Sequence, residues 1–308
     1  MEIKKKRGFL VGNEDNSVQT IEKAPDRLKV LERIEEYEKN GWWSKDVEDD
    51  PPTIPLTPDK VDYLNKKLIN KILSKIITRK AEKFIDDLIA SKKLIIKDVR
   101  GLENFTSLAN QGTVITCNHF NAFDNFAIHH VVLPYLHKEH RELYKVIREG
   151  NYTNFPGLYG LFFRHCHTLP LSSNFSTMKK FMEAMDILLK RGEKVLVYAE
   201  QGMWWNYRKP RPLTSGAFSF AVTSNVPVLP MFITMEDSDL IGDDGFPIQE
   251  YTLHILEPLF PDPNKSRKEN INFMKEKNYQ MWKKVYEDFY GIPLVYQKND
   301  ALDTTSDK

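Results

Sequence analysis

A histidine and an aspartate lie five positions apart in the stretch VITCNHFNAFDNFAIHH, residues 114–130. His119 follows an apolar run typical of a strand, and Asp124 stands where a helical pattern begins. A neutral imidazole takes a proton from a hydroxyl group when a carboxylate fixes its tautomer and stabilises the resulting cation. The pair therefore fits general base catalysis. Asp124 is also a favoured N-cap residue, so the spacing alone leaves a purely structural role open.

A serine nucleophile is not indicated by this sequence. The Gly-x-Ser-x-Gly motif, which presents a nucleophilic serine in many hydrolases, does not occur in it. A histidine base without a protein nucleophile indicates that the substrate supplies the attacking hydroxyl group. The predicted reaction is the transfer of an acyl group to an alcohol.

A second polar segment, YAEQGMWWNYRKPRP at residues 198–212, follows another apolar strand pattern. Ligands of α/β folds gather where strands end and helices begin, so this segment and the histidine are expected at one site. Arg208, Lys209 and Arg211 suit a clamp for a phosphate group. An ordinary solvated basic loop has the same pattern, and the sequence leaves both interpretations open.

The two cysteines, Cys117 and Cys166, form no disulfide framework and no zinc-finger spacing, which favours a reducing cytosol. Cys117 lies in an apolar strand pattern, and we expect it in the core rather than as a nucleophile. His165 and His167 flank Cys166 and would share one face of a strand. No fourth ligand follows at a suitable spacing, so we predict no metal site.

The elements that must position these residues alternate along the chain from residue 94 onward. Strand patterns cover 113–117, 142–149, 167–171, 194–200, 226–235 and 250–259, and helical patterns cover 124–136, 153–163, 176–192, 214–225 and 266–290. This alternation predicts an α/β fold with a central, mostly parallel sheet flanked by helices, preceded by an amphipathic helical segment. We expect one catalytic domain at 94–265, then a C-terminal helix and polar tail at 266–308.

Residues 1–59 form a polar N-terminal extension, in which MEIKKKRGFL lacks the apolar core of a signal peptide. A charged helical stretch is followed by a proline-rich arm, which we expect to pack on the main body through Trp42 and Trp43. The other tryptophan pair, Trp204 and Trp205, suits an acyl tunnel, a membrane interface or the core. The sequence does not decide among these three.

The segment 60–93 is predicted to be a basic amphipathic helix. Its apolar residues recur every three or four positions over 60–89, and eight Lys and Arg residues stand on the other face. Such a helix binds an anionic membrane surface, or it docks on its own protein core and leaves its lysines in solvent. No run of about 18 apolar residues occurs in the sequence, so we predict no membrane-spanning helix. The net charge of +1 argues against nucleic acid as a partner.

Three ordered blocks resemble the glycerolipid (lysophosphatidic acid) acyltransferase family. VRGLENFTSLANQGTVITCNHFNAFDNFAI resembles the first block, with its Asn-His and H-x4-D motif. RGEKVLVYAEQG resembles the third block, which ends in a Pro-Glu-Gly motif, and NVPVLPMFI resembles the fourth. The resemblance spans residues 96–258 in the order of the family.

The resemblance implies a mechanism in which His119 is the general base and Asp124 orients it. The activated hydroxyl group attacks the thioester of acyl-CoA or acyl carrier protein, and no acyl-enzyme forms. Asn118 and Glu200 match family positions, Gln201 stands where the third block has glycine, and Gly202 follows it; Asn118, Glu200 and Gly202 are the candidate substrate-binding residues. No metal or redox cofactor is implied.

Two departures from the family concern the acceptor's phosphate group. Ser173 stands where the second block has an arginine, and the arginine of the third block is also missing. Arg164, upstream of the second block, and the basic residues at 208–211 are the candidate replacements. If they do not bind phosphate, the acceptor is not a phosphorylated glycerol.

We therefore expect an O-acyltransferase of phospholipid biosynthesis with a lysophosphatidic-acid-like acceptor. It would be cytoplasmic and associated peripherally with the inner face of the membrane through residues 60–89. The alternative keeps the chemistry and changes the acceptor to a glycolipid, a cell-wall lipid or another lysolipid. A third hypothesis is a non-catalytic lipid-binding protein.

Overall fold

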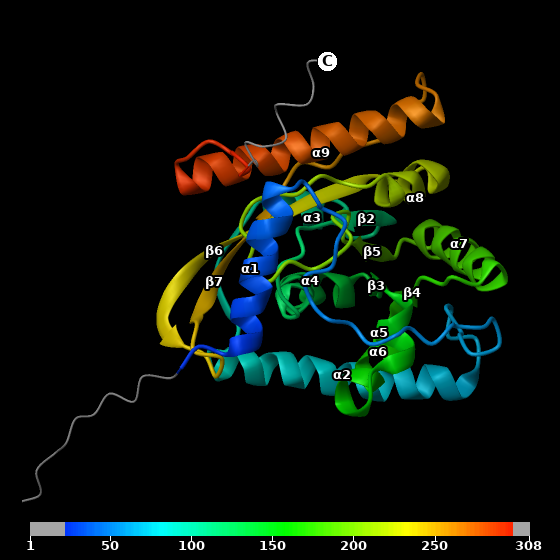
Figure 1. The fold of residues 1–308 in the computed structure, drawn as a ribbon. Helices are drawn as coiled ribbons and strands as arrows, with labels where there is room; N and C mark the ends of the chain where they lie inside the picture. The colour runs from blue at the N-terminus through cyan, green and yellow to red at the C-terminus, as the bar shows by residue number, and fades with distance from the viewer. Residues whose placement is uncertain (1–21, 298–308) are drawn as a thin grey trace, which may run out of the picture.

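A seven-stranded sheet forms the centre of the protein in a computed structural model that describes residues 22–297 (Figure 1). The strands are β1 (Ile95–Arg100), β2 (Thr113–Thr116), β3 (Leu143–Ile147), β4 (Thr168–Pro170), β5 (Lys194–Val197), β6 (Val228–Ile241) and β7 (Pro247–Ile255). They lie in the order β1-β7-β6-β2-β5-β3-β4. Only β6 and β7 pair antiparallel among the described strands. The predicted mostly parallel α/β fold is confirmed.

Helices cover both faces of the sheet. They are α1 (Pro25–Lys39), α2 (Leu68–Ala90), α3 (Leu102–Thr106), α4 (Asp124–Lys138), α5 (Glu149–Asn154), α6 (Gly157–His165), α7 (Phe175–Lys190), α8 (Gly216–Ser224) and α9 (Arg267–Tyr290). Figure 1 shows α8 and α9 on one face and α2 on the other. Within residues 22–297, none of the helices combines the length and apolar content needed to cross a bilayer.

The core lies in two layers because successive strand residues point to opposite faces. Val114, Val195 and Val228 pack with α7, α8 and α9 in one cluster. Ile115 and Leu196, one position further along the same strands, pack with α2, α3 and α4 in the other. Both faces of β2 and β5 are therefore buried, which explains their continuous apolar sequences.

Several element boundaries differ from the sequence predictions. The helix expected over 153–163 is two helices, α5 and α6, because Phe155 and Pro156 lie between them and Gly157, with a φ of +61°, begins α6. The basic helix begins at Leu68 rather than near residue 60. The helix expected from residue 176 begins at Phe175, and Asn174 caps it, since its side chain accepts the backbone N–H of Thr177.

The N-terminal arm crosses the outside of the predicted active-site loops. It runs from α1 to the start of α2 (Figure 1), and Trp43 stacks on Trp204 at 5.5 Å between ring centroids. The predicted packing of the arm on the main body is confirmed for Trp43. Trp42 instead contacts Tyr37 of α1, at 5.8 Å, and is partly exposed. The leader-peptide prediction concerns MEIKKKRGFL, which lies outside the described residues.

Candidate active site

His119 and Asp124 form a hydrogen-bonded pair at the carboxyl end of β2. Nδ1 of His119 lies 2.7 Å from Oδ2 of Asp124, whose side chain is fully buried, whereas 21% of the histidine side chain is exposed. An Nδ1–H that donates to the carboxylate leaves Nε2 with its lone pair. Nε2 makes no hydrogen bond to any described residue. This arrangement suits a base that accepts a proton at Nε2.

Asp124 also organises the loop that precedes α4. Its Oδ2 accepts the backbone N–H groups of Phe120, at 3.1 Å, and Asn121, at 3.3 Å. Phe123 occupies the N-cap position, and Asp124 is the first residue of the helix. The two roles left open by the sequence therefore coexist, because one carboxylate shapes the loop and holds the imidazole.

Tyr198 is a member of this group that the sequence analysis missed. Its hydroxyl donates to Oδ1 of Asp124 at 2.5 Å, and its ring stacks on His119 at 3.8 Å between centroids. Burial raises the pKa of this phenol well above its usual value, so it remains a donor. The position of Tyr198 could have been predicted from the pairing of the strands. Thr116 of β2 pairs in parallel with Val197 of β5, so the residues that follow the two strands lie side by side.

Glu200 holds the histidine backbone in place. Its Oε2 accepts the N–H of His119 at 3.1 Å, and its Oε1 accepts the N–H of Arg211 at 2.7 Å. The guanidinium of Arg211 pairs with Glu200 at 3.2 Å and also donates to the carbonyl of Gly202. Both charged side chains are buried. The predicted substrate residues Glu200, Gly202 and Arg211 thus form an internal brace behind His119.

Asn118 has a similar bracing role. Its side-chain amide donates to the carbonyl of Ile233 at 2.9 Å, and its Oδ1 accepts the N–H of Ile233 at 2.8 Å. The side chain therefore continues the pairing of β2 with β6 beyond the end of the strand. It presents no free amide to a substrate.

The predicted phosphate clamp is not assembled. Arg208 pairs with Asp237 at 2.6 Å, and Lys209 pairs with Glu38 of α1 at 2.6 Å. Arg164 donates to the carbonyl of Phe155, at 3.1 Å, between α5 and α6. Like the buried Arg211, each of these cations contacts a group of the protein itself, and their binding of an acceptor's phosphate stays a prediction.

Ser173 does not replace the second-block arginine functionally. Its backbone N–H and its hydroxyl both donate to Oε2 of Glu149, at 3.1 and 3.0 Å. Glu149 also accepts the N–H of Leu56 from the arm at 2.6 Å. The end of β4 is therefore tied to the arm through an acidic side chain.

Comparison with known proteins places this group of residues within a family match. The family model described as Acyltransferase matches residues 97–234, which include the His119–Asp124 pair and the Glu200 brace. Residues 97–234 belong to the acyltransferase family. The resemblance drawn from the ordered blocks is thereby confirmed, as is the prediction that the chain is an acyltransferase.

The fold of this acyltransferase is similar to a solved crystal structure, the 1-acyl-sn-glycerophosphate (LPA) acyltransferase PlsC from Thermotoga maritima. The TM-score is 0.50, the sequence identity is 17%, and the match covers 88% of this chain and 97% of that one. A comparison with curated protein sequences gave no match. At 17% identity, this structural similarity is evidence for a shared fold alone.

The remaining candidates of the acyltransferase lie in its interior. Trp204 and Trp205 are buried with Val30, Ile34 and Val47 of α1 and the arm, so they belong to the core and line no membrane surface. Cys117 is fully buried, and burial raises the pKa of its thiol well above the usual value, which agrees with a core residue.

His165 and His167 do not share a strand face. His165 ends α6, and His167, with a φ of +53°, precedes β4. Within the described part of the chain, no group of three or more His, Cys, Asp or Glu side chains is arranged to hold a metal ion.

Proposed function

We propose that this acyltransferase moves a fatty acyl group from acyl-CoA or acyl carrier protein to a hydroxyl group of a lipid acceptor, with His119 as general base. The observation that carries the proposal is the 2.7 Å contact of Nδ1 with buried Asp124, which leaves Nε2 without a protein partner. Nε2 takes the hydroxyl proton while the oxygen attacks the thioester carbonyl. The C–S bond then breaks, and the imidazolium returns its proton to the departing thiolate.

The first candidate acceptor is a lysophosphatidic acid. The fold likeness to a protein titled a 1-acyl-sn-glycerophosphate acyltransferase supports it. The order of the family blocks around His119 and Glu200 supports it as well. The acceptor would present its free hydroxyl to Nε2 at the carboxyl edge of the sheet.

A second candidate is an acceptor without a phosphomonoester, such as a glycolipid, a cell-wall lipid or another lysolipid. The specific observation in its favour is that Arg208, Lys209 and Arg211 are each paired with a carboxylate of the chain. Releasing Lys209 or Arg211 to bind a phosphate would leave a buried carboxylate, Glu38 or Glu200, without its partner, which is unfavourable. The second-block position also favours this candidate, because it holds Ser173 where the family has an arginine.

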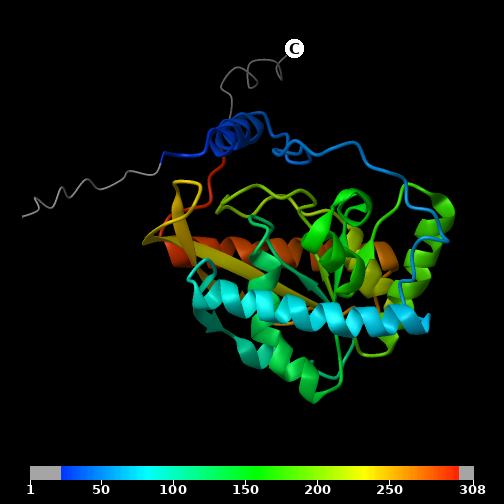
Figure 2. The ribbon, with the colours of Figure 1, turned by 90° about the horizontal axis from the view of Figure 1, so that it is seen from below.

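We also propose that the enzyme docks on the inner face of the cytoplasmic membrane through α2. Leu68, Ile69, Ile72 and Ile76 are exposed on its outer side, with Leu68 at 73%. Figure 2 views the molecule from this side, with α2 lying across the near surface. Exposed apolar residues of the neighbouring α6 extend the patch; they are Leu158, Tyr159 and Leu161. An apolar stripe beside lysines is typical of a helix that lies in a membrane interface.

In the test, the purified enzyme is incubated with palmitoyl-CoA or with palmitoyl-acyl carrier protein. Each donor is combined with one of two acceptors. Lysophosphatidic acid and monoacylglycerol differ by the phosphate group alone, so their relative turnover separates the two candidates. His119→Ala is the matched control, with folding checked by circular dichroism. Wild-type turnover in that variant contradicts the proposed base. Co-purified lipid without turnover of any pair favours the non-catalytic hypothesis.

A further inference from the structure

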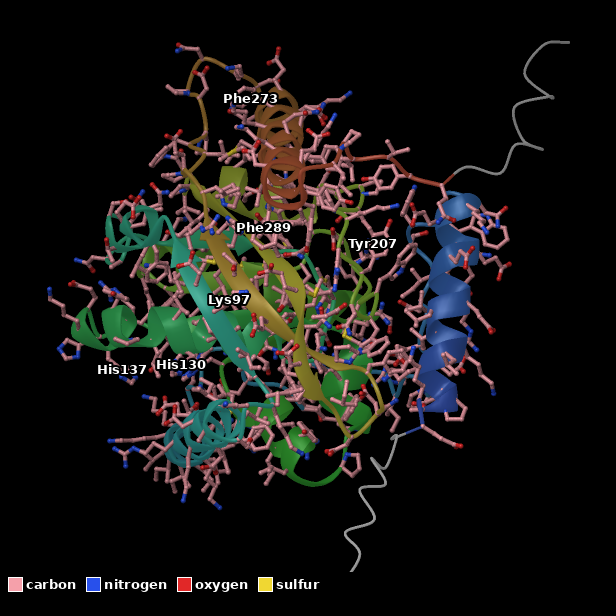
Figure 3. All side chains as sticks on the ribbon, turned by 90° about the vertical axis from the view of Figure 1, so that its left-hand side faces the viewer. Lys97, His130, His137, Tyr207, Phe273 and Phe289 are labelled. Atoms are coloured by element: carbon pink, nitrogen blue, oxygen red, sulfur yellow. The ribbon has the colours of Figure 1, made fainter. Side chains whose placement is uncertain are left out.

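A cavity of about 480 Å³ lies between α2, the C-terminal end of α4 and the amino ends of β3 and β4. His119 follows the carboxyl end of β2, which runs parallel to β5, and β5 runs parallel to β3. The cavity therefore opens at the edge of the sheet opposite the proposed active site. Figure 3 shows one lining residue, His137, on α4 and on the side toward α2.

Three cations from successive turns of α2 line this cavity: Lys71, Lys75 and Arg79. Their spacing of four residues puts them in one row, about 12 Å long at 1.5 Å per residue. None of the three side chains makes a hydrogen bond or ion pair with a described residue. This contrasts with the basic residues around the active site, which are paired. Unpaired cations that converge on a cavity favour an anionic ligand.

The acidic groups of the cavity contact histidines, and neither of them forms an ion pair with the cations of the row. Glu82 lies 3.9 Å from Nε2 of His137, and Glu142 lies 3.5 Å from Nδ1 of His167. The row on α2 therefore keeps its positive charge for a ligand.

A buried hydroxyl lies against the same cavity. Oγ1 of Thr78 is inaccessible to solvent and has no hydrogen-bond partner among the described residues beyond a weak contact with the thiol of Cys166. A buried hydroxyl with so poor a partner is unfavourable, and because Thr78 lines the cavity, rotation about χ1 would let it donate to a phosphate oxygen there. Thr78 is thus an independent sign of a ligand that accepts hydrogen bonds.

The position of the cation row indicates which anion it meets. On a helix, Lys75 and Arg79 are neighbours of Leu68, Ile72 and Ile76, the exposed stripe proposed above to enter the bilayer. Lipid phosphates lie directly above the acyl chains that such a stripe contacts. The charge and the place of the row both match the headgroup of a membrane lipid.

We propose that this cavity binds the phosphate-bearing headgroup of an anionic phospholipid, at a site separate from the catalytic one. The cations and the Thr78 hydroxyl contact the phosphate oxygens, while the lipid chains stay in the bilayer beside the apolar stripe. This site rests on the proposed docking of α2 and makes attachment depend on membrane composition. It does not depend on acyl transfer.

The test measures binding to phosphatidylcholine vesicles with and without phosphatidylglycerol by flotation, with no acyl donor present. Thr78→Val changes no charge, so general electrostatic attraction is unaffected by it. We expect it to weaken binding to the phosphatidylglycerol vesicles about tenfold to a hundredfold, the usual effect of one hydrogen bond to a charged group. Unchanged binding by Thr78→Val overturns the proposal.

A pair of charge-matched variants gives a second readout. The first variant combines three substitutions in the cavity, Lys71→Gln, Lys75→Gln and Arg79→Gln. The second variant combines three substitutions outside the cavity, Lys66→Gln, Lys80→Gln and Lys83→Gln. We expect the first variant to lose the preference for phosphatidylglycerol and the second to retain most of it. Equal losses would indicate a diffuse charge effect and reject the cavity.

Titration with soluble inorganic phosphate separates the two sources of the anion. The lipid assignment predicts weak phosphate binding that does not displace the protein from vesicles. Tight phosphate binding that is lost in Thr78→Val would make this a free-phosphate site instead. Acyl transfer by the same variants is assayed separately with soluble donor and acceptor, so failure of the proposed enzyme chemistry and failure of this site are distinguishable.

Discussion

At the scale of single residues, the proposed chemistry depends on one carboxylate that serves several partners. Asp124 accepts hydrogen bonds from His119, Tyr198 and two backbone N–H groups of its loop. Because the carboxylate is fully buried, each of these donors limits its movement and fixes the imidazole. Tyr198 is accordingly a positioning residue, acting through Asp124.

Tyr198→Phe removes the hydroxyl donor and keeps the ring that stacks on His119. We expect kcat to fall about tenfold to a hundredfold with KM unchanged, because a hydrogen bond to a charged group contributes about 1.5–3 kcal/mol. Steady-state kinetics check this result. Tyr63→Phe is the control, since its hydroxyl donates to the carbonyl of Pro170 and is separate from Asp124. A loss of kcat in the control as large as in Tyr198→Phe contradicts the assigned role.

The buried pair of Glu200 and Arg211 makes a prediction about stability. Glu200→Gln leaves the Arg211 guanidinium buried without a counter-charge, which costs about 3–5 kcal/mol of unfolding free energy. Combining it with Arg211→Met removes the unpaired charge and restores part of the loss. Urea denaturation measures both variants. A single variant as stable as the wild type would show that the pair is not the brace described here.

Glu142 predicts a pH dependence of stability. Burial, with a contribution from Glu193, raises the pKa of its carboxyl group from 4.5 to about 7. The neighbouring His167 offers no charge in return, because burial lowers its pKa to about 4. The folded state therefore binds more protons than the unfolded state between pH 4.5 and about 7. The stability that this group contributes at low pH is lost as the pH rises through about 7.

Glu142→Gln removes this titration. We expect its melting temperature to exceed that of the wild type near pH 8 and to approach it near pH 5. Thermal melts at both pH values, monitored by circular dichroism, check the prediction. A constant difference between the two proteins over this range contradicts it.

At the scale of elements, α2 resolves an ambiguity that the sequence left open. Ile77, Ile85 and Leu88 are buried on the core side, whereas Ile72 and Ile76 are exposed on the outer side. The apolar positions of 60–89 are therefore divided between the protein core and solvent. Docking on the protein and the proposed binding to a membrane are compatible, because they use different faces of the helix.

Two alanine variants test this division. Ile85→Ala removes a buried side chain and should cost about 2–4 kcal/mol of unfolding free energy. Ile72→Ala changes an exposed position and should cost less than about 0.5 kcal/mol. Vesicle flotation should show the reverse order. We expect Ile72→Ala to bind vesicles more weakly than the folded fraction of Ile85→Ala does. A large loss of stability in Ile72→Ala would place that side chain in the core.

The sequence predicted most elements because strand and helix periodicities are local properties. The limits of α2 were harder to predict, since Asp62 accepts the backbone N–H groups of Lys66 and Lys67 and closes a turn before the helix begins. β1 was missed because it is short and partly exposed, with Lys97 and Asp98 in its middle. The helices α5 and α6 were merged because the effect of Pro156 and Gly157 was not anticipated.

At the scale of the whole molecule, the features of the site that the sequence did not reveal depend on contacts between elements that are distant in sequence. The spacing of His119 and Asp124 and the block order predicted the central pair. The Tyr198 contact requires β5 to lie beside β2, and the burial of Trp204 requires the arm to cover the third block. The cations at 208–211 suggested an anion site because their acidic partners, such as Glu38, are distant in sequence.

The two functions proposed here lie at opposite edges of one sheet. The carboxyl edge carries the proposed base, and the helix α2 carries an apolar stripe with a cation-lined cavity near the amino edge. Since the formal net charge is only +1, attraction to an anionic membrane must come from this local arrangement.

The central claim is that His119 and Asp124 act as one unit in acyl transfer, and a double-mutant cycle tests it most directly. The kcat of folded wild type, His119→Ala, Asp124→Asn and the double variant is measured with one donor and one acceptor. The account predicts a fall of about 10²–10⁴-fold for His119→Ala and no further loss in the double variant, because Asp124 acts through the imidazole. Independent, multiplying losses, or a wild-type kcat in His119→Ala, would contradict it.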